Sequence, residues 1–236
     1  MKTLIGQAII LDKSELKEAD IRVLLSTDNF GHIYAIGPNA KKSKIRFVGG
    51  LNTFSHIEFS INKKEELFIL DESTLIDENG LAFENIHNFI TASSLVEVAE
   101  KLFTLNNPAE TAYYKLKFAL AHLDNKKDLK LIFSFLNHSL IDIGEIPELS
   151  ACTMCQRAIT GKKILFNYYR GGIVCNICSK KDNRGENIPQ NLYKFLTANA
   201  SEANNFEERV VRQGIFLYER YIRFKLGISF KSFLFL

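Results

Sequence analysis

Short apolar runs separated by turn residues dominate the first third of the chain. They occur up to about residue 82, and Gly, Pro, Asn and Asp residues lie between them. Runs of this length and spacing are typical of strands in a small antiparallel barrel or sandwich. The expected strand segments are AIIL at 8–11, IRVLLST at 21–27, HIYAIG at 32–37, IRFVGG at 45–50, FSHIEFSI at 54–61 and LFILDE at 67–72.

Beyond about residue 82 the apolar residues recur every three to four positions, which indicates helices that pack on one another. Helix boundary residues support this reading. In chain order the expected signals are a capping box at Ser94 and Glu97, Pro108 in a first turn, Asp128 as a cap, Gly144 as a stop, Pro189 as a start, and a long helix from about Phe206 to Leu226 before Gly227.

Every cysteine of the chain lies between residues 152 and 178. Cys152 and Cys155 form one Cys-x-x-Cys pair, and Cys175 and Cys178 form the other. A two-residue gap lets both thiolates of a pair reach one metal ion, and the segment between the pairs can form a hairpin that brings them together. Four thiolates fill a tetrahedral site, so we predict one structural zinc ion. Two disulfides or a redox-active Cys-x-x-Cys are the alternatives.

The cellular compartment of the protein bears on the choice between metal ligands and disulfides. The N-terminal segment has a short apolar run, but acidic residues follow it and no small-residue cleavage site is present, which does not fit a signal peptide. No stretch of about 18 apolar residues occurs, so we predict no membrane span. We therefore expect a cytoplasmic protein, whose thiols stay reduced, and this favours metal ligands over disulfides.

Charge is unevenly distributed although the formal net charge is only +3. Residues 151–236 carry 14 basic and 6 acidic side chains, whereas residues 1–82 carry 10 and 12, and residues 83–150 carry 6 and 9. No acidic residue lies between Asp28 and Glu58, where cations cluster beside a predicted turn at GPNAKKSK. Both basic regions suit a polyanion. The alternative is an ordinary solvated surface.

In oligonucleotide-binding barrels, basic loops follow the phosphates and strand aromatics stack on bases. We therefore predict DNA contacts on the barrel and on the basic C-terminal face, although strand aromatics are more often core residues. The expected contacts are Lys41, Lys42, Lys44, Arg46, Tyr34 and Phe47 in the barrel, and Lys162, Lys163, Arg170, Lys180 and Lys181 in the C-terminal part.

Motifs that would indicate an enzyme are missing. In GPNAKKSK, Lys42 stands where a Walker A loop needs its second glycine. The zinc site of a deaminase needs a His-x-Glu upstream of its cysteines, and none of the five histidines sits in that arrangement with the two cysteine pairs. Neither a carboxylate cluster nor a nucleophile elbow occurs. The histidines, expected at the surface or as hydrogen-bonded core residues, are His32, His56, His87, His122 and His138.

Several short segments keep the order and spacing of a known family. They are AIIL at 8–11, AD followed by IRVLLST at 19–27, IGPNAKKSK at 36–44, GLNTF at 50–54, IDIGEIPEL at 141–149, CTMC with RGGIVCNIC, and the final GISFKSFLFL. Together they resemble the bacterial recombination mediator family RecO, and the resemblance covers nearly the whole chain.

The resemblance implies an α+β fold, with an oligonucleotide-binding (OB) barrel at residues 1–82 and a helical domain at residues 83–236 that carries a zinc module at residues 150–180. It implies a DNA repair and recombination mediator, without enzymatic activity, that binds single- and double-stranded DNA and anneals complementary strands. With RecR, such a protein assists RecA loading onto DNA coated by single-strand-binding protein. We expect a cytoplasmic, nucleoid-associated protein. A zinc-ribbon scaffold that binds only proteins, or a nuclease, are the alternatives.

Overall fold

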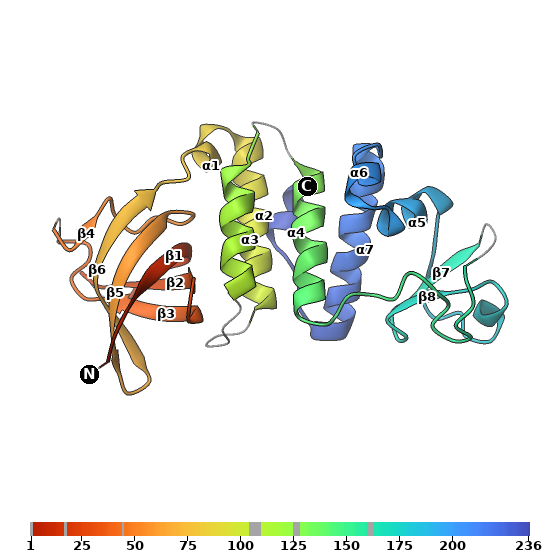
Figure 1. Ribbon diagram of the computed structural model, residues 1–236, viewed down its shortest axis with the longest axis horizontal. Coiled ribbons are helices and arrows are strands. Elements are labelled where there is room, and N and C mark those ends of the chain that lie inside the picture. The colour runs from red at the N-terminus through yellow and green to blue at the C-terminus, as the bar shows by residue number, and fades with distance from the viewer. Residues whose placement is uncertain (1, 17, 44, 104–109, 125–127, 160–162) are drawn as a thin grey trace. The chain divides into compact units, whose positions relative to one another are not determined.

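The computed structural model describes residues 2–16, 18–43, 45–103, 110–124, 128–159 and 163–236. The chain separates into two units. Unit 1 consists of residues 1–128 with Phe235, and unit 2 consists of residues 129–234 with Leu236. Figure 1 shows the strands of the first part of the chain in red to orange and the helices in yellow to blue.

The apolar runs of the first third form strands, as the sequence predicts. Each expected run overlaps one strand, and the run at 45–50 contributes only a very short one. The strands are β1 (Lys2–Glu15), β2 (Ile21–Thr27), β3 (Gly31–Gly37), β4 (Phe47–Val48), β5 (His56–Lys64) and β6 (Leu67–Asp77).

Five of these strands close into a barrel. β1 pairs with β2 and β5, β2 pairs with β3, and β5 pairs with β6, all antiparallel. The barrel closes where β3 and β6 pair in parallel, with Ala35 opposite Phe68. A register shift between Ile10 and Asp12 bends the long strand β1, so that it can pair with a different strand at each edge. This strand order is that of an OB barrel, so the predicted fold class is confirmed.

Alternate residues of the strands fill the barrel. Ile10, Val23, Ile33 and Ile57 have no more than 1% of their surface exposed, and they belong to one apolar cluster. Burying an aliphatic side chain of this size contributes about 1.5–3 kcal/mol relative to leaving it in water. The barrel is therefore filled with side chains, and a ligand can bind only on its outside or at its rims.

Three helices complete unit 1: α1 (Leu81–Glu84), α2 (Ile86–Leu102) and α3 (Glu110–Ala121). α2 begins well before the predicted capping box, because the Asn85 side chain accepts a hydrogen bond from the backbone N–H of Asn88. The prediction at Ser94 is wrong: Ser94 is buried within the helix, and its hydroxyl donates to the carbonyl of Ile90. Pro108 lies outside the described residues.

Unit 2 combines helices with a small sheet. Its helices are α4 (Leu129–Asp142), α5 (Gln190–Thr197), α6 (Ala200–Ala203) and α7 (Glu208–Leu226), with short 3₁₀ helices at Cys178–Lys180 and Ser232–Phe235. Its strands are β7 (Ile164–Asn167), β8 (Gly172–Val174) and β9 (Glu186–Ile188), in the order β8-β7-β9. The expected starts near Asp128 and Pro189 and the stops at Gly144 and Gly227 agree with these bounds.

The helices of unit 2 bury apolar side chains against one another. Phe133 of α4 lies with its ring centroid 4.5 Å from Phe195 of α5 and 5.3 Å from Tyr218 of α7. Gly214 permits this close packing, because a Cβ there would lie 2.8 Å from the Phe195 ring. Among the described residues, no helix has the length and apolar character needed to cross a membrane.

Candidate metal centre and nucleic-acid interface

The four cysteines meet beside the small sheet of unit 2. Cys152 and Cys155 precede β7, and Cys175 and Cys178 follow β8. β7 and β8 form the antiparallel hairpin that the sequence predicts between the pairs, with Leu165 opposite Val174. As a result, all four sulfur atoms lie within 4.8 Å of one another.

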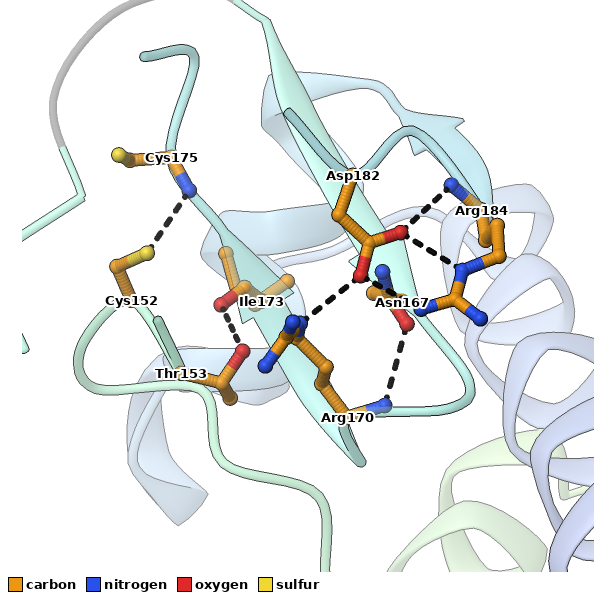
Figure 2. Close-up of polar contacts among 8 residues, drawn as sticks. All are labelled: Cys152, Thr153, Asn167, Arg170, Ile173, Cys175, Asp182 and Arg184. Atoms are coloured by element: carbon orange, nitrogen blue, oxygen red, sulfur yellow. Dashed lines mark hydrogen bonds and ion pairs between the residues drawn. The ribbon is translucent and has the colours of Figure 1, made fainter. Parts of the chain in front are cut away.

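The two cysteine pairs have matching backbone geometry. The N–H of Gln156 donates to the carbonyl of Cys152 at 2.8 Å, and the N–H of Ser179 donates to the carbonyl of Cys175 at 2.9 Å. Each pair therefore occupies a tight turn that directs both thiols of the pair to one point. The N–H of Cys175 also donates to the Cys152 sulfur at 3.3 Å, which links the two turns (Figure 2).

The spacing of the sulfurs fits a single tetrahedral ion. Zinc–sulfur bonds of about 2.3 Å place tetrahedral sulfur ligands about 3.8 Å apart. The Cys155 and Cys175 sulfurs are 3.9 Å apart. A disulfide needs about 2.05 Å, and all four cysteines are free thiols. The cluster can thus hold a metal ion with no rearrangement of the backbone.

The thiols differ in acidity. Burial raises the pKa of Cys152, but backbone N–H groups led by that of Cys175 outweigh it and lower this pKa to about 6. Burial and hydrogen bonds to the other cysteine sulfurs raise the pKa of Cys178 to about 12. The Cys152 thiolate thus opposes ionisation of Cys178, and a bound cation would remove this opposition because metal-bound thiols are deprotonated.

A buried carboxylate holds the far end of the β7–β8 hairpin. Asp182 Oδ1 accepts from Arg184 Nε at 2.9 Å, and Oδ2 accepts from Arg170 Nε at 3.0 Å (Figure 2). The Arg184 guanidinium, together with that of Arg170, holds the pKa of Asp182 well below its usual range. Asn167 accepts from the backbone N–H of Arg170 at 3.1 Å, which fixes the turn.

The basic loop of the barrel lies at a surface groove of about 530 Å³. The groove is lined by Lys13, Glu15, Ile21, Ala40, Lys41, Ser43, Phe47, Gly49, Gly50, Leu51 and Asn52. The loop is fixed to the start of β2, because Asp20 accepts from the backbone N–H of Asn39 at 2.9 Å and the carbonyl of Ala19 accepts from that of Lys41 at 3.1 Å. Lys41 and Lys42 therefore project from a turn that is held in place by these hydrogen bonds.

The predicted barrel cations differ in what they contact. Lys41 forms an ion pair with Glu15 at 2.7 Å, which offsets part of its charge. Lys42 is exposed, and no ion pair joins its side chain to any residue that the structure describes. The Arg46 guanidinium donates to the carbonyl of Pro38 and lies 5.1 Å from the centre of the Phe47 ring. Lys44 lies outside the described residues.

Of the two predicted stacking aromatics in the barrel, one is accessible. Tyr34 is 39% exposed, and the Arg22 guanidinium lies 5.1 Å from the centre of its ring. The expectation for Phe47 needs correction: this ring is 4% exposed and belongs to the barrel core. In the two-residue strand β4, Phe47 points inward and its neighbour Val48, 50% exposed, points outward.

The predicted C-terminal contacts are mostly exposed. Lys163, Lys180 and Lys181 lie at the surface of unit 2, and Lys162 lies outside the described residues. Arg170 is 38% exposed in its side chain but is paired with Asp182. Sequence reasoning missed Lys13, which donates to Asn52 at the barrel groove, and Arg184, which covers the ring of Tyr169. Neither has a sequence signal, because both depend on contacts formed by folding.

Among the described residues, no histidine belongs to the cluster of possible metal ligands. His87, His122 and His138 are exposed, and His56 shares a hydrogen bond of 2.8 Å with the Tyr113 hydroxyl. His32 departs from the expectation, since it is 1% exposed and neither ring nitrogen has a partner of good hydrogen-bond geometry among the described residues, with only the Phe103 backbone close enough to oppose the fall in its pKa. Burial lowers the pKa of His32 to about 4, so its ring is neutral at neutral pH.

Comparison with known proteins places both parts of the chain in one family. The family model described as "Recombination protein O N terminal" matches residues 1–79, and the model described as "Recombination protein O C terminal" matches residues 84–233. The two matches follow each other along the chain in the order that their descriptions name.

Individual relatives agree with these matches. A protein of Thermoanaerobacter sp. named DNA repair protein RecO is 27% identical over 98% of this chain and 96% of its own length. The protein of the same name from Caldanaerobacter subterraneus is 25% identical over 98% of this chain and 96% of its own length. The one from Desulfatibacillum aliphaticivorans is 32% identical over 72% of this chain and 69% of its own length.

Proposed function

Because this chain belongs to the recombination protein O family, whose relatives are named as DNA repair proteins, we propose that it is a DNA-binding mediator of repair and recombination without enzymatic activity. It binds single- and double-stranded DNA and anneals complementary strands. The observation that carries the proposal is an OB barrel on which Lys41, held in place through its backbone, lines a surface groove.

Phosphate contact is the main source of DNA affinity in this proposal. Lys41, Lys42, Lys44 and Arg46 of the barrel supply the cations, and Tyr34 supplies an accessible ring. The basic surface of unit 2, with Lys162, Lys163, Arg170, Lys180 and Lys181, is the second contact region. Two separate cationic regions allow one molecule to hold two strands and to screen the repulsion between them.

Zinc has a structural role in this proposal. Cys152, Cys155, Cys175 and Cys178 hold one ion, and four thiolate ligands leave no position for a water or a substrate. The ion joins the segment before β7 to the segment after β8, because each segment provides two of the four ligands. The residues of the second DNA contact region are thereby kept in one arrangement.

The salt dependence of DNA binding tests the barrel cations. Replacing Lys41 and Lys42 by Ala should weaken single-stranded DNA binding and reduce the magnitude of the slope of log affinity against log salt by about 1.4, since each phosphate contact contributes about 0.7. Sequence preference should not change, because phosphate contacts carry no base information. The measurement is fluorescence anisotropy with a labelled oligonucleotide across a salt series.

Glu15 provides the matched control for this slope. Replacing Glu15 by Gln removes the carboxylate that pairs with Lys41, so affinity should rise while the fold is retained, because Glu15 is 75% exposed in its side chain. An unchanged slope in the double lysine variant would place the phosphate contacts elsewhere, and the basic surface of unit 2 would be the next region to test.

Annealing is the activity that we expect without ATP. Each base-pair step releases about 1.4 kcal/mol on average, so the protein only has to speed the encounter of two strands. A fluorescence assay on complementary oligonucleotides, with and without ATP and then with strands coated by single-strand-binding protein, should give equal acceleration in both nucleotide conditions. If the annealing rate at low salt with the protein equals the spontaneous annealing rate, the proposed annealing activity is wrong.

Partner proteins follow from the family. We propose that the chain acts in the cytoplasm, associated with the nucleoid, together with RecR, and that it helps RecA replace single-strand-binding protein on DNA.

The competing candidate is a zinc-ribbon scaffold that binds only proteins, favoured by the exposed basic surface of unit 2. Absence of any DNA affinity in the isolated chain would select the scaffold, whereas strand cleavage with magnesium or manganese would select a nuclease.

A further inference from the structure

An exposed aromatic pair lies on unit 2, apart from the cysteines. Tyr169 belongs to the turn between β7 and β8, and Phe224 belongs to the last part of α7. Their ring centroids are 4.6 Å apart with an interplanar angle of 67°. Tyr169 is 57% exposed and Phe224 is 45% exposed. The two rings thus contact each other while leaving much of their surface in water.

A guanidinium extends this aromatic surface. The Arg184 guanidinium carbon lies 4.5 Å from the centre of the Tyr169 ring. Asp182 holds it in place through Nε at 2.9 Å and Nη2 at 3.0 Å, while the Arg184 side chain remains 57% exposed (Figure 2). One carboxylate therefore orders the guanidiniums of both Arg170 and Arg184, and a positive charge is left over.

The turn that carries Tyr169 is fixed before any ligand binds. Phe166 packs with its ring centroid 5.7 Å from that of Tyr221, and the Tyr168 hydroxyl accepts from Arg220 Nε at 3.3 Å. Gly171 has φ +64°, a conformation that a side chain disfavours. Tyr168 attaches the turn to α7, so the neighbouring Tyr169 is not required for that purpose.

A groove continues the surface along α7. It has a volume of about 280 Å³ and is lined by Phe216 and Arg220 of α7 together with β9 and Pro189. Glu186 of β9 pairs with Arg220 at 2.6 Å, which offsets part of its charge. Phe216, Arg220 and Phe224 are spaced four residues apart, so they lie along one face of the helix. From Phe216 to Phe224 this face extends about 12 Å, long enough for a short run of nucleotides.

We propose that Tyr169, Phe224 and Arg184 form a base-stacking platform for single-stranded DNA. Beside it, Arg170 and Arg220 are each paired with one carboxylate, and the three guanidiniums keep one net positive charge for the phosphates. This inference deepens the proposed function and rests on it. Flat aromatic and guanidinium planes stack on unpaired bases of any sequence, and neighbouring cations bind the backbone. An acidic peptide would satisfy the cations, but it would cover the two exposed rings only if it also carried aromatic side chains, whereas every nucleotide of a single strand carries a flat base.

Stacking and ionic contacts are separable by experiment. We would measure binding of the full chain to a dT oligonucleotide and to an abasic strand of equal length, by fluorescence anisotropy over a salt series. Wild type should bind the dT strand more tightly than the abasic strand. Replacing Tyr169 and Phe224 together by Leu should lower dT affinity at least about fivefold with an unchanged salt slope, and should leave abasic binding as it was.

Leucine keeps apolar bulk at both positions, so the fold should survive, and thermal melting and metal content verify this. Tyr169→Phe should keep wild-type affinity, because the ring remains. Tyr114→Ala is the matched control, since Tyr114 of unit 1 is also 57% exposed, and it should have no effect. Phe224→Leu alone, on the surface of α7, should give a partial loss of dT affinity.

The outcomes separate the platform from the proposed function. If wild type binds dT and abasic strands equally, or if the double variant loses both equally, the contacts are ionic and the platform is wrong while DNA binding stands. If wild type binds neither strand, both the platform and the proposed function fail. Selective loss of dT binding in the folded double variant, with Tyr169→Phe unaffected, supports the platform.

Discussion

If the four cysteines hold zinc as proposed, replacing Cys152 or Cys178 by Ser should remove the metal and unfold the cysteine module. Structural zinc sites in peptides contribute about 10–16 kcal/mol of apparent binding free energy at neutral pH. A whole domain is stabilised by only about 5–15 kcal/mol, so the loss of one of four ligands exceeds what the module can tolerate. Metal content by elemental analysis and the thermal midpoint should fall together.

Asn176→Ala is the matched control for this result. Asn176 lies between Cys175 and Cys178 and is exposed, and its backbone carbonyl, which accepts from the Ser179 hydroxyl, is unchanged by the substitution. This variant should keep full metal content. Cobalt added to the wild-type protein should give the spectrum of tetrahedral thiolate coordination. Wild-type protein that is folded but holds no stoichiometric metal would contradict the zinc assignment.

Gly172→Ala should have the second largest effect, because two backbone segments touch at this residue. A Cβ on Gly172 would lie 2.2 Å from the carbonyl oxygen of Glu148 and 2.9 Å from its nitrogen. The carbonyl of Glu148 accepts from the N–H of Ile173 at 2.9 Å, and the N–H of Glu148 donates to the carbonyl of Gly171 at 2.9 Å. Neither backbone can move without loss of these hydrogen bonds.

We expect a destabilisation of about 2–4 kcal/mol from overpacking and from the two weakened hydrogen bonds. The thermal midpoint should fall by about 10 °C or more. Gly80→Ala is the control, since a Cβ there meets nothing within 4 Å, and it should change stability by less than about 0.5 kcal/mol. Equal melting curves for the two variants would show that the Glu148 segment can shift aside.

Local patterns in the sequence are sufficient for the strands and for the metal ligands. The period of the apolar residues depends on each element alone, so the pattern by itself locates β1, β2, β3, β5 and β6. The two Cys-x-x-Cys pairs are likewise local, since each two-residue gap fits a single turn. The failure at Ser94 has a local cause too, because Asn85 is the residue that caps α2.

The choice among similar side chains could not be made from the sequence. The pattern treats Lys41 and Lys42 alike, yet Glu15, which lies far from both in the sequence, pairs with Lys41. It also treats Tyr34 and Phe47 alike, yet the barrel core takes up the Phe47 ring and leaves that of Tyr34 exposed. Ion pairing and burial arise from contacts between distant segments, and these form only on folding.

Patterns along the chain were therefore enough to predict the barrel, the helices and the four thiols that gather at one point. Which cations keep their charge for a partner, and which rings stay in water, depends on contacts that form when the chain folds. Tyr169 and Arg184 illustrate the reason: a buried carboxylate at Asp182 aims the guanidinium across the ring, and the packing of the turn against α7 leaves that surface open. Periodicity and spacing describe neighbours along the chain, whereas such a surface is made by neighbours in space.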